Sequence, residues 1–288
     1  MLLLVLSLLS PDAEAFGGFG GRRGVATASV PATFVTSPAT GEKVAYFVMT
    51  PEGTGPWTAV VVIPGLNSDA KQALVPGFTG AFTREGMAVV AFDPPGLGQS
   101  GGQNDNGGKL AQSALLATLD AVSKDKRFSA VGVVSRSYGV TTATGAMARN
   151  AHPAKFLVDW EGPPDRERSI GCRDANSQPP ERLRQLGFGA CNDEVYWADR
   201  EAIEFVGKLG VPYQRVQTER DHVHPDNQHA IDMVQAALAG GVPWVRIDDE
   251  AVNANIKSPS QVHFLPEQGD FNAELARYAK ELFDYTAK

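Results

Sequence analysis

The 288-residue chain contains only two cysteines and five histidines. Two cysteines cannot supply the ligands of a cysteine-based structural zinc site, so a small zinc-stabilised module of that class is excluded. The chain has no repeat of fixed period, which argues against a solenoid or a propeller. It also has no block of lysine and arginine, and its formal net charge of -7 disfavours nucleic acid and anionic membrane surfaces as partners.

The amino-terminal segment has most features of an export signal. Residues 1–15 form a short apolar run that ends in Pro11 and an Ala-x-Ala pattern, so we predict a signal peptide and a secreted or periplasmic protein. No Lys or Arg precedes the run, so a wrongly assigned start, and with it a cytoplasmic protein, is the alternative. The run is too short to span a bilayer. Glycine-rich residues 16–29 are expected to form a flexible linker.

The two cysteines, Cys172 and Cys191, lie close together in sequence within a loop-rich region. In an oxidising compartment such a pair predicts a disulfide, which would stabilise the fold by about 3 kcal/mol through the shorter denatured-state loop. Two separate buried thiols are the alternative.

Residues 30–288 alternate strand-like and helical patterns, and their length suits one large α/β domain. The expected strands are 45–50, 59–63, 87–92, 130–134, 155–159, 213–217 and 244–247, and the expected helices are 71–84, 109–124, 138–149, 193–209, 225–238 and 272–287. Several strands are apolar throughout, so the pattern predicts a mostly parallel central sheet with helices on both faces. Residues 162–192 break the alternation and predict a small lid insert over the carboxyl edge of the sheet, where active sites gather.

The sequence Ser-Arg-Ser-Tyr-Gly at 135–139 follows a predicted strand and leads into a helix of small residues. A strand, a tight turn and a helix in this order are typical of a nucleophile elbow, which holds a serine in a strained backbone conformation. The usual pattern is Gly-x-Ser-x-Gly, and Ser135 stands here in place of the first glycine. Ser137 is therefore the candidate nucleophile, and a helix-capping serine is the alternative.

Two further motifs accompany this turn. Pro-Gly-Leu-Asn-Ser-Asp at 64–69 and Asp-Pro-Pro-Gly-Leu-Gly-Gln-Ser-Gly-Gly at 93–102 each follow a predicted strand. The three motifs, in this order, resemble those of the α/β-hydrolase superfamily, and the resemblance covers nearly all of residues 30–288. It implies the α/β-hydrolase fold, and it implies that the backbone N–H groups of Leu66 and Tyr138 form an oxyanion hole.

The same resemblance implies the chain order nucleophile, acid, histidine. It places the acid at Asp221, after the predicted strand 213–217, and the base at His263, after the last strand. Other carboxylates stay open as the acid, because some members carry it elsewhere; they are Glu219, Asp159 and Glu161. Acyl transfer by such a triad needs no cofactor.

Three more histidines, His222, His224 and His229, lie close together near Asp226. Imidazoles and a carboxylate at this density are able to bind zinc or another transition metal. The segment also fits the start of a helix, with Pro225 at the first helical position. We favour the structural interpretation and predict no metal.

Together these features predict a serine hydrolase that cleaves a small-molecule or polymer carboxylic ester through an acyl-enzyme. A peptidase or an acyltransferase of the same fold is one alternative, and a catalytically inactive hydrolase fold used for binding is another. Trp160, Tyr196 and Trp197 are candidates for an apolar substrate pocket, with burial in the core as their alternative role.

Overall fold

The computed structural model describes residues 30–174, 176–224 and 226–288. The predicted signal peptide and the predicted linker, residues 1–29, lie outside the described residues. The chain divides into Met1–Val30 and Pro31–Lys288, and the second unit holds every described element. None of the helices in this described part combines the length and the apolar character that a membrane crossing requires.

A mixed sheet forms the centre of this unit, and within the described residues its order is β1-β2-β4-β3-β5-β6-β7-β8-β9. The strands are β1 (Ala32–Thr36), β2 (Lys43–Met49), β3 (Trp57–Ile63), β4 (Met87–Phe92), β5 (Phe128–Arg136), β6 (Leu157–Trp160), β7 (Tyr213–Val216), β8 (Val245–Ile247) and β9 (Glu250–Ala251). The strands from β4 to β8 in this order run parallel, whereas β1, β2 and β9 pair antiparallel at the two sides. The predicted mostly parallel sheet is therefore confirmed.

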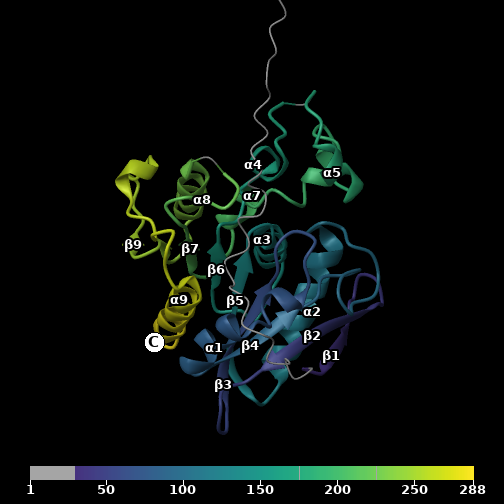
Figure 1. The fold of residues 1–288 in the computed structure, drawn as a ribbon, viewed down its shortest axis with the longest axis vertical. Helices are drawn as coiled ribbons and strands as arrows, with labels where there is room; N and C mark the ends of the chain where they lie inside the picture. Colours follow the sequence, from purple (N-terminus) through teal and green to yellow (C-terminus); the bar gives the residue numbers. More distant parts are fainter. Residues whose placement is uncertain (1–29, 175, 225) are drawn as a thin grey trace, which may run out of the picture. The chain divides into compact units, whose positions relative to one another are not determined.

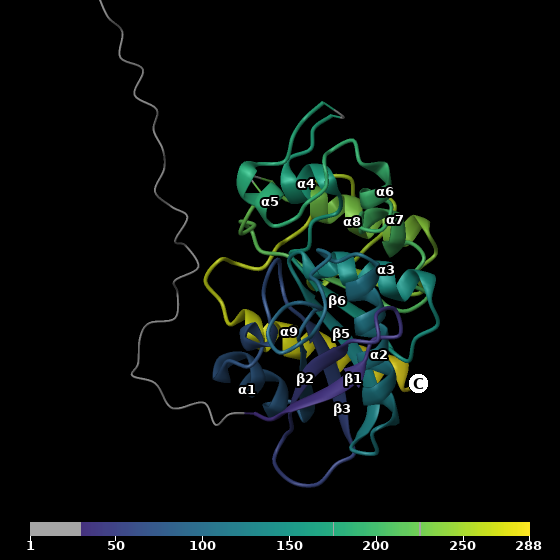
Figure 2. The ribbon, with the colours of Figure 1, turned by 90° about the vertical axis from the view of Figure 1, so that its right-hand side faces the viewer.

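Helices cover both faces of the sheet, as predicted (Figure 1, Figure 2). On one face, α1 (Pro76–Arg84) packs against α9 (Phe271–Thr286). On the other face lie α2 (Lys109–Lys124), α3 (Gly139–Arg149) and α8 (Gln228–Ala239). The shorter helices are η1 (Ala70–Gln72), α4 (Arg166–Ile170), α5 (Glu181–Gln185), α6 (Glu194–Trp197), α7 (Ile203–Val206) and η2 (Pro259–Gln261).

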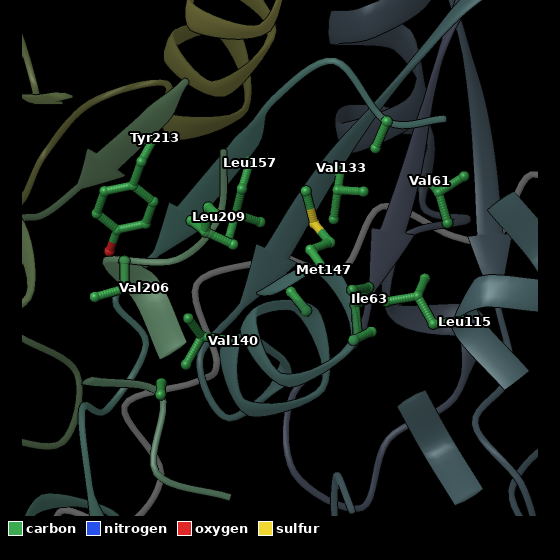
Figure 3. Packing of buried hydrophobic residues seen from close by; sticks show 14 of the residues in the cluster. Val61, Ile63, Leu115, Val133, Val140, Met147, Leu157, Val206, Leu209 and Tyr213 are labelled. Atoms are coloured by element: carbon green, nitrogen blue, oxygen red, sulfur yellow. The ribbon is translucent and has the colours of Figure 1, made fainter. Parts of the chain in front are cut away.

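The core lies between the sheet and its helices because the central strands are apolar on both faces. Figure 3 shows part of one buried cluster, in which Val61, Val133 and Leu157 of the sheet meet Leu115 of α2 and Met147 of α3. Each of these five side chains is at most 2% exposed. Each therefore contributes about 1.5–3 kcal/mol to the free energy of unfolding. The packing of this core fixes the positions of the central strands, and with them the positions of the residues that follow their carboxyl ends.

Three predicted helices differ from the structure by more than one residue at an end. The predicted helix 225–238 begins at Gln228, with Asn227 as its N-cap, so position 225 is not its first helical residue. The predicted helix 71–84 begins later, because Pro76 starts α1 and favours the first helical turn. The predicted helix 193–209 is wrong: α6 and α7 replace it, with a break between them. Arg200 lies in this break, and its guanidinium donates to the carbonyl oxygens of Tyr196 and Asp105. These tertiary hydrogen bonds hold the chain out of a continuous helix.

The predicted insert, residues 162–192, holds α4 and α5 and lies beyond the ends of β5 and β6 (Figure 1). The predicted disulfide between Cys172 and Cys191 is confirmed, with the two Cα atoms 5.4 Å apart. Both cysteines are buried in a second apolar cluster together with Trp197 and Tyr138. Tyr138 immediately precedes α3, so the insert is anchored on the turn between β5 and α3.

Candidate active site

The turn between β5 and α3 has the geometry of a nucleophile elbow. Ser137 lies in this turn with a φ of 48°, a left-handed conformation that is uncommon for residues other than glycine. Its backbone N–H donates to the carbonyl oxygen of Trp160 at 2.8 Å, which ties the turn to β6. A Cβ on Gly139 would lie 2.7 Å from the carbonyl oxygen of Pro64, so the close approach of α3 to β3 requires glycine. The turn therefore holds Ser137 at the carboxyl edge of the sheet.

Ser135 replaces the first glycine of the usual elbow motif without disturbing the turn. Its side chain is buried, with Oγ 3.5 Å from Oδ1 of Asp159. By contrast, a Cβ on Gly132 of the same strand would lie 2.2 Å from the ring of Phe156. β5 therefore requires glycine at position 132 but has room for serine at position 135, which accounts for the departure from the motif.

The hydroxyl of Ser137 faces an imidazole that in turn faces a carboxylate. Oγ of Ser137 lies 3.0 Å from Nε2 of His222, and Nδ1 of His222 lies 2.7 Å from Oε2 of Glu161. Because a carboxylate accepts, Nδ1 carries the hydrogen, and Nε2 is then the acceptor for the Ser137 hydroxyl. The three residues follow β5, β7 and β6, so they meet at the edge where the sequence predicts a site. An alcohol, an imidazole and a carboxylate in this order are the groups that activate a serine nucleophile.

Glu161 is 4% exposed and is held from two sides. Its Oε1 accepts from the backbone N–H of Thr218 at 3.2 Å and from the hydroxyl of the same residue. Its own backbone N–H donates to the carbonyl oxygen of Val216 at 3.0 Å, and its φ of 50° is left-handed. These contacts leave Oε2 directed at His222, so Glu161 orients the imidazole.

The structure does not bring the predicted base, His263, to Ser137. The side chain of His263 is 99% exposed, and its Nδ1 lies 2.9 Å from Oε1 of Glu250. The imidazole at hydrogen-bond distance from Ser137 is that of His222. The prediction that His263 lies beside Ser137 is therefore wrong, and His222 is the imidazole in that position.

An extra backbone pairing explains where His263 lies. Leu265 forms a parallel bridge with Thr218, and its N–H donates to the carbonyl oxygen of Gln217 at 3.1 Å. The chain before α9 therefore runs beside the end of β7, and His263 borders a surface groove there. Glu219, another candidate acid, borders the same groove, is exposed, and donates its backbone N–H to Leu265 O at 2.8 Å.

The predicted acid, Asp221, is also not the carboxylate that hydrogen-bonds to the histidine. Its Oδ1 lies 3.8 Å from Nδ1 of His222, whereas Oε2 of Glu161 lies 2.7 Å from that atom. Oδ1 of Asp221 instead lies 2.9 Å from Nδ1 of His224, and Oδ2 accepts from the side chain of Gln217 at 2.9 Å. Glu161, one of the alternatives left open by the sequence, therefore occupies the position of the acid.

The buried group of Asp221, His224 and His229 brings potential metal-ligating atoms within 4.8 Å of one another. Each of these side chains is already engaged. Nε2 of His224 lies 2.9 Å from the carbonyl oxygen of Arg168, and Nε2 of His229 lies 3.1 Å from the guanidinium of Arg215. A guanidinium in that position opposes a metal cation. Burial raises the pKa of Asp221, but hydrogen bonds led by those from His224 and His229 outweigh it, and the net pKa lies well below the ordinary value.

Asp159, the remaining candidate acid, is fully buried and engaged elsewhere. Its Oδ2 forms an ion pair with Nη1 of Arg215 at 2.7 Å and accepts from the hydroxyl of Tyr213 at 2.8 Å. Its Oδ1 accepts from the backbone N–H of Gly162 at 3.1 Å. Asp159 therefore links β6 to β7 rather than to the imidazole.

The predicted oxyanion donors flank the nucleophile. Among the described residues, neither the backbone N–H of Leu66 nor that of Tyr138 donates to a protein acceptor. Both residues border a small pocket together with Gly65. The N–H of Gly65 donates to Oε1 of Gln72 at 3.1 Å, and a Cβ on Gly65 would lie 3.5 Å from Cβ of Ser137. Two unused N–H groups beside Ser137 suit the stabilisation of an oxyanion.

The glycine-rich loop at 93–102 supports the turn that carries Leu66. Oδ1 of Asp93 accepts from the N–H of Ala70, and Oδ2 accepts from the N–H of Gln99, each at 2.7 Å. A Cβ on Gly98 would lie 2.2 Å from Oδ2 of Asp93, so the loop requires glycine there. Asp93 therefore has a structural role between the loop and η1.

The three aromatic candidates for a substrate pocket have different surroundings. Trp197 is fully buried, and its indole N–H donates to the carbonyl oxygen of Ala190 at 2.9 Å. Tyr196 packs edge-on against Trp197 with ring centroids 4.9 Å apart, so both belong to the packing of the insert. Trp160 borders a second, small pocket together with Arg136. Trp160 is therefore the candidate of the three that lines a pocket, one that also includes the residue directly before Ser137.

Sequence reasoning missed His222 and ranked Asp221 above Glu161. The resemblance implies a histidine after the last strand, whereas His222 follows β7 and Glu161 follows β6. The imidazole and the carboxylate beside Ser137 each follow a strand one earlier than the resemblance implies. The signal that points to them is positional: Glu161 directly follows a buried strand, and the order nucleophile, acid, histidine is kept at 137, 161 and 222.

No family model matches the chain, and no curated protein matches it in sequence. Among solved structures it is similar to Est1E from Butyrivibrio proteoclasticus with bound ferulic acid (15% identity, TM-score 0.63, covering 89% of this chain and 100% of that chain). It is similar to the α/β hydrolase GrgF from Penicillium (13%, 0.63, 90% and 99%). It is also similar to dipeptidyl peptidase 4 from Porphyromonas gingivalis (16%, 0.61, 88% of this chain and 35% of that chain). With its strand order and its elbow after β5, the chain has the α/β-hydrolase fold.

Proposed function

We propose that the protein is a serine hydrolase that cleaves a carboxylic ester, with Ser137 as nucleophile, His222 as base and Glu161 as acid. The observation that carries this proposal is the continuous hydrogen-bond chain from Oγ of Ser137 through His222 to the carboxylate of Glu161. A serine that only capped a helix would need neither partner. The solved structures of similar fold include esterases, which supports an ester as the substrate.

The reaction begins when Oγ of Ser137 attacks the carbonyl carbon of the ester while Nε2 of His222 takes the hydroxyl proton. The N–H groups of Leu66 and Tyr138 stabilise the negative charge that develops on the carbonyl oxygen. Glu161 stabilises the imidazolium. His222 then gives the proton to the leaving alcohol, and Ser137 is left acylated.

Water completes the cycle. Nε2 of His222 takes a proton from a water molecule, whose oxygen attacks the acyl carbon. The proton then returns to Oγ of Ser137 as the carboxylic acid leaves. The separation of 3.0 Å between Oγ and Nε2 suits direct proton transfer in both halves of the reaction.

A fluorophosphonate probe tests the nucleophile directly, because it labels only an activated serine. We expect the wild type to be labelled and Ser137→Ala to remain unlabelled. Ser123→Ala, which removes an exposed hydroxyl of α2, is the matched control and should be labelled like the wild type. Circular dichroism shows whether each variant is folded. A folded wild type that is never labelled would instead favour a hydrolase fold used for binding.

Substrate class is tested with a panel of p-nitrophenyl esters and aminoacyl p-nitroanilides. We expect ester cleavage in the wild type and its loss in Ser137→Ala. Cleavage of anilides without cleavage of esters would assign a peptidase. Transfer of the acyl group to an added alcohol in preference to water would assign an acyltransferase.

We also propose that the protein works in a secreted or periplasmic setting. The disulfide between Cys172 and Cys191 supports this location, because cytosolic thiols are kept reduced.

A further inference from the structure

The two residues that carry the proposed oxyanion donors meet in one apolar cluster. Tyr138 lies in the turn after β5 and is 6% exposed, and Leu66 lies in the turn after β3. Tyr138 belongs to the second apolar cluster, and the partly buried side chain of Leu66 packs against the same cluster. This packing therefore links two turns that are far apart in the sequence.

Phe188, which lies in the insert, makes several of the aromatic contacts in this cluster. It is 6% exposed, and its ring meets the ring of Tyr138 edge-on, with the centroids 5.4 Å apart. It also lies beside Tyr196 and Trp197, with ring centroids at 6.4 and 6.3 Å. Because an edge-on contact between rings is favourable, Phe188 joins the elbow turn to the packing of the insert.

The chain around Phe188 is cross-linked. The disulfide joins Cys172 to Cys191, and both cysteines are buried in the same cluster. Arg166 of α4 adds a second tie, because its Nη1 donates to the carbonyl oxygen of Cys191 at 3.0 Å and its Nε lies 2.7 Å from Oε1 of Glu201. These contacts restrict how far Phe188 is able to move away from Tyr138.

An oxyanion hole is effective only when its donors are fixed in place before the charge develops. In the part of the chain that the structure describes, the N–H groups of Leu66 and Tyr138 donate to no protein acceptor, as donors to a substrate require. Hydrogen bonds of these two groups therefore do not set their positions relative to each other. The packing of the two side chains in one cluster does link them.

We propose that the insert positions the oxyanion hole, with Phe188 as the positioning residue that holds Tyr138 and, through the shared cluster, Leu66. This inference rests on the proposed function. Phe188 acts through the backbone N–H of Tyr138 and not on the ester itself. A displaced N–H group stabilises the developing oxyanion less well, so the cost falls on the transition state more than on the bound ester.

Steady-state kinetics with p-nitrophenyl acetate test this role. Phe188→Ala removes the ring that packs on Tyr138, so kcat and kcat/KM should both fall by about 10- to 100-fold, which is less than the loss of a whole donor. KM should change by less than about 3-fold, because the bound ester gains little from the hole. Phe188→Leu keeps a large apolar side chain in place and should recover most of the loss.

A matched control and an inhibitor separate positioning from a loss of stability. Val195→Ala removes an apolar side chain of α6 that is 86% exposed, and it should leave kcat and KM unchanged. Rates are divided by the number of sites that a fluorophosphonate labels at completion, so an unfolded fraction does not enter the comparison. Phenylboronic acid forms a tetrahedral adduct on Oγ of Ser137, and its inhibition constant should rise in Phe188→Ala by about the factor that kcat/KM loses.

The disulfide supplies a second variant, in which Phe188 itself is unchanged. Cys172→Ala combined with Cys191→Ala removes the cross-link between the two ends of the segment that carries Phe188. We expect kcat and kcat/KM to fall together by about 3- to 30-fold, with KM nearly unchanged. If circular dichroism shows that Phe188→Ala does not fold, this variant decides the matter.

The fluorophosphonate label also separates this inference from the proposed function. If the wild type is labelled and cleaves the ester, but folded Phe188→Ala keeps the wild-type kcat/KM per labelled site, the positioning role is overturned. A rise in KM with an unchanged kcat would overturn it as well, because the insert would then bind the ester directly. If the wild type is not labelled at all, the proposed function itself fails.

Discussion

Two pairs of a carboxylate and an imidazole lie close together around the loop between β7 and α8, and they differ in what the second ring nitrogen faces. In one pair, Glu161 lies 2.7 Å from Nδ1 of His222, and Nε2 faces the hydroxyl of Ser137. In the other, Asp221 lies 2.9 Å from Nδ1 of His224, and Nε2 lies 2.9 Å from the carbonyl oxygen of Arg168 in α4.

The chemistry of each pair follows from that second partner. A carbonyl oxygen only accepts, so Nε2 of His224 donates a hydrogen and has no lone pair at that position with which to take a proton. A hydroxyl donates, so Nε2 of His222 accepts and is ready to take the proton of Ser137. In the proposed mechanism, the same residue types therefore supply a general base in one pair, whereas in the other they link α4 to the loop after β7.

The largest loss of activity is expected when the imidazole of the first pair, His222, is replaced. His222→Gln should lower kcat/KM for p-nitrophenyl acetate by about 10⁴- to 10⁶-fold, because Ser137 then has no base. His263→Gln should leave kcat/KM unchanged, since the side chain is 99% exposed and faces Glu250. Steady-state kinetics on both variants measure the difference. A large loss in His263→Gln with full activity in His222→Gln would reverse the assignment of the base.

The next largest effect on kcat/KM is expected from replacing Glu161, and it is compared with the effect of replacing Asp221. Glu161→Gln presents an amide N–H₂ to Nδ1 of His222 and favours the wrong tautomer, so kcat/KM should fall by about 10³- to 10⁴-fold. Asp221→Asn should lower kcat/KM by less than about 10-fold, because Asp221 is 3.8 Å from that nitrogen. Its main cost should be to stability, by about 3–5 kcal/mol, since a buried charged network loses its anion.

Urea unfolding followed by tryptophan fluorescence measures the stability of these two variants, with activity measured on the folded protein. His224→Gln is the matched control, which should destabilise like Asp221→Asn and keep most of the activity. If Asp221→Asn loses activity as deeply as Glu161→Gln while it remains folded, the division between the catalytic and the structural pair is wrong.

The fold and the elbow turn at Ser137 could be predicted from the sequence, because both depend on local patterns. Apolar runs fix the parallel strands, and the elbow at Ser137 needs only a strand, a turn and a helix that are adjacent in the chain. The base is different, because several strands end at the same edge and each is followed by polar residues. Which of them reaches Ser137 depends on tertiary pairing.

The pairing that decides this is the bridge between Leu265 and Thr218, which lies outside the named strands. Because of this bridge, the segment before α9 runs beside the end of β7, and the side chain of His263 is exposed to solvent. No local pattern in 259–266 marks this bridge, since a single pair of residues has no periodicity. The choice between Asp221 and Glu161 depended in the same way on contacts with Thr218 and His224 that join separate strands.

The smallest expected effect is a change in how stability depends on pH, and it concerns a third buried carboxyl, Asp248. Comparing Asp248 with Asp221 sharpens the contrast between buried carboxyls in different surroundings. Oδ1 of Asp248 accepts from the backbone N–H of Gln217 at 3.0 Å, while Oδ2 has no partner among the described residues. Burial raises the pKa of Asp248 from 3.8 to about 8, whereas the hydrogen bonds around Asp221 lower the pKa of that group. The two carboxyls therefore have opposite effects on stability as the pH changes.

A carboxyl whose pKa is raised by folding contributes stability below its unfolded pKa, and this contribution is lost as the pH rises toward the folded pKa. The wild type should therefore lose free energy of unfolding at Asp248 between about pH 4 and pH 8, by up to about 1.4 kcal/mol per pH unit. Asp248→Asn imitates the neutral acid and has no such loss. Urea unfolding at pH 5, 7 and 9 should show the variant gaining on the wild type by a few kcal/mol as the pH rises. Asp221→Asn should behave in the opposite sense, because its deficit stays constant from pH 5 to pH 9 and shrinks only below about pH 4, where the unfolded-state carboxyl takes up its proton. Urea unfolding at pH 3 therefore checks Asp221→Asn, and an offset of Asp248→Asn that stays constant between pH 5 and pH 9 would contradict the assignment of Asp248.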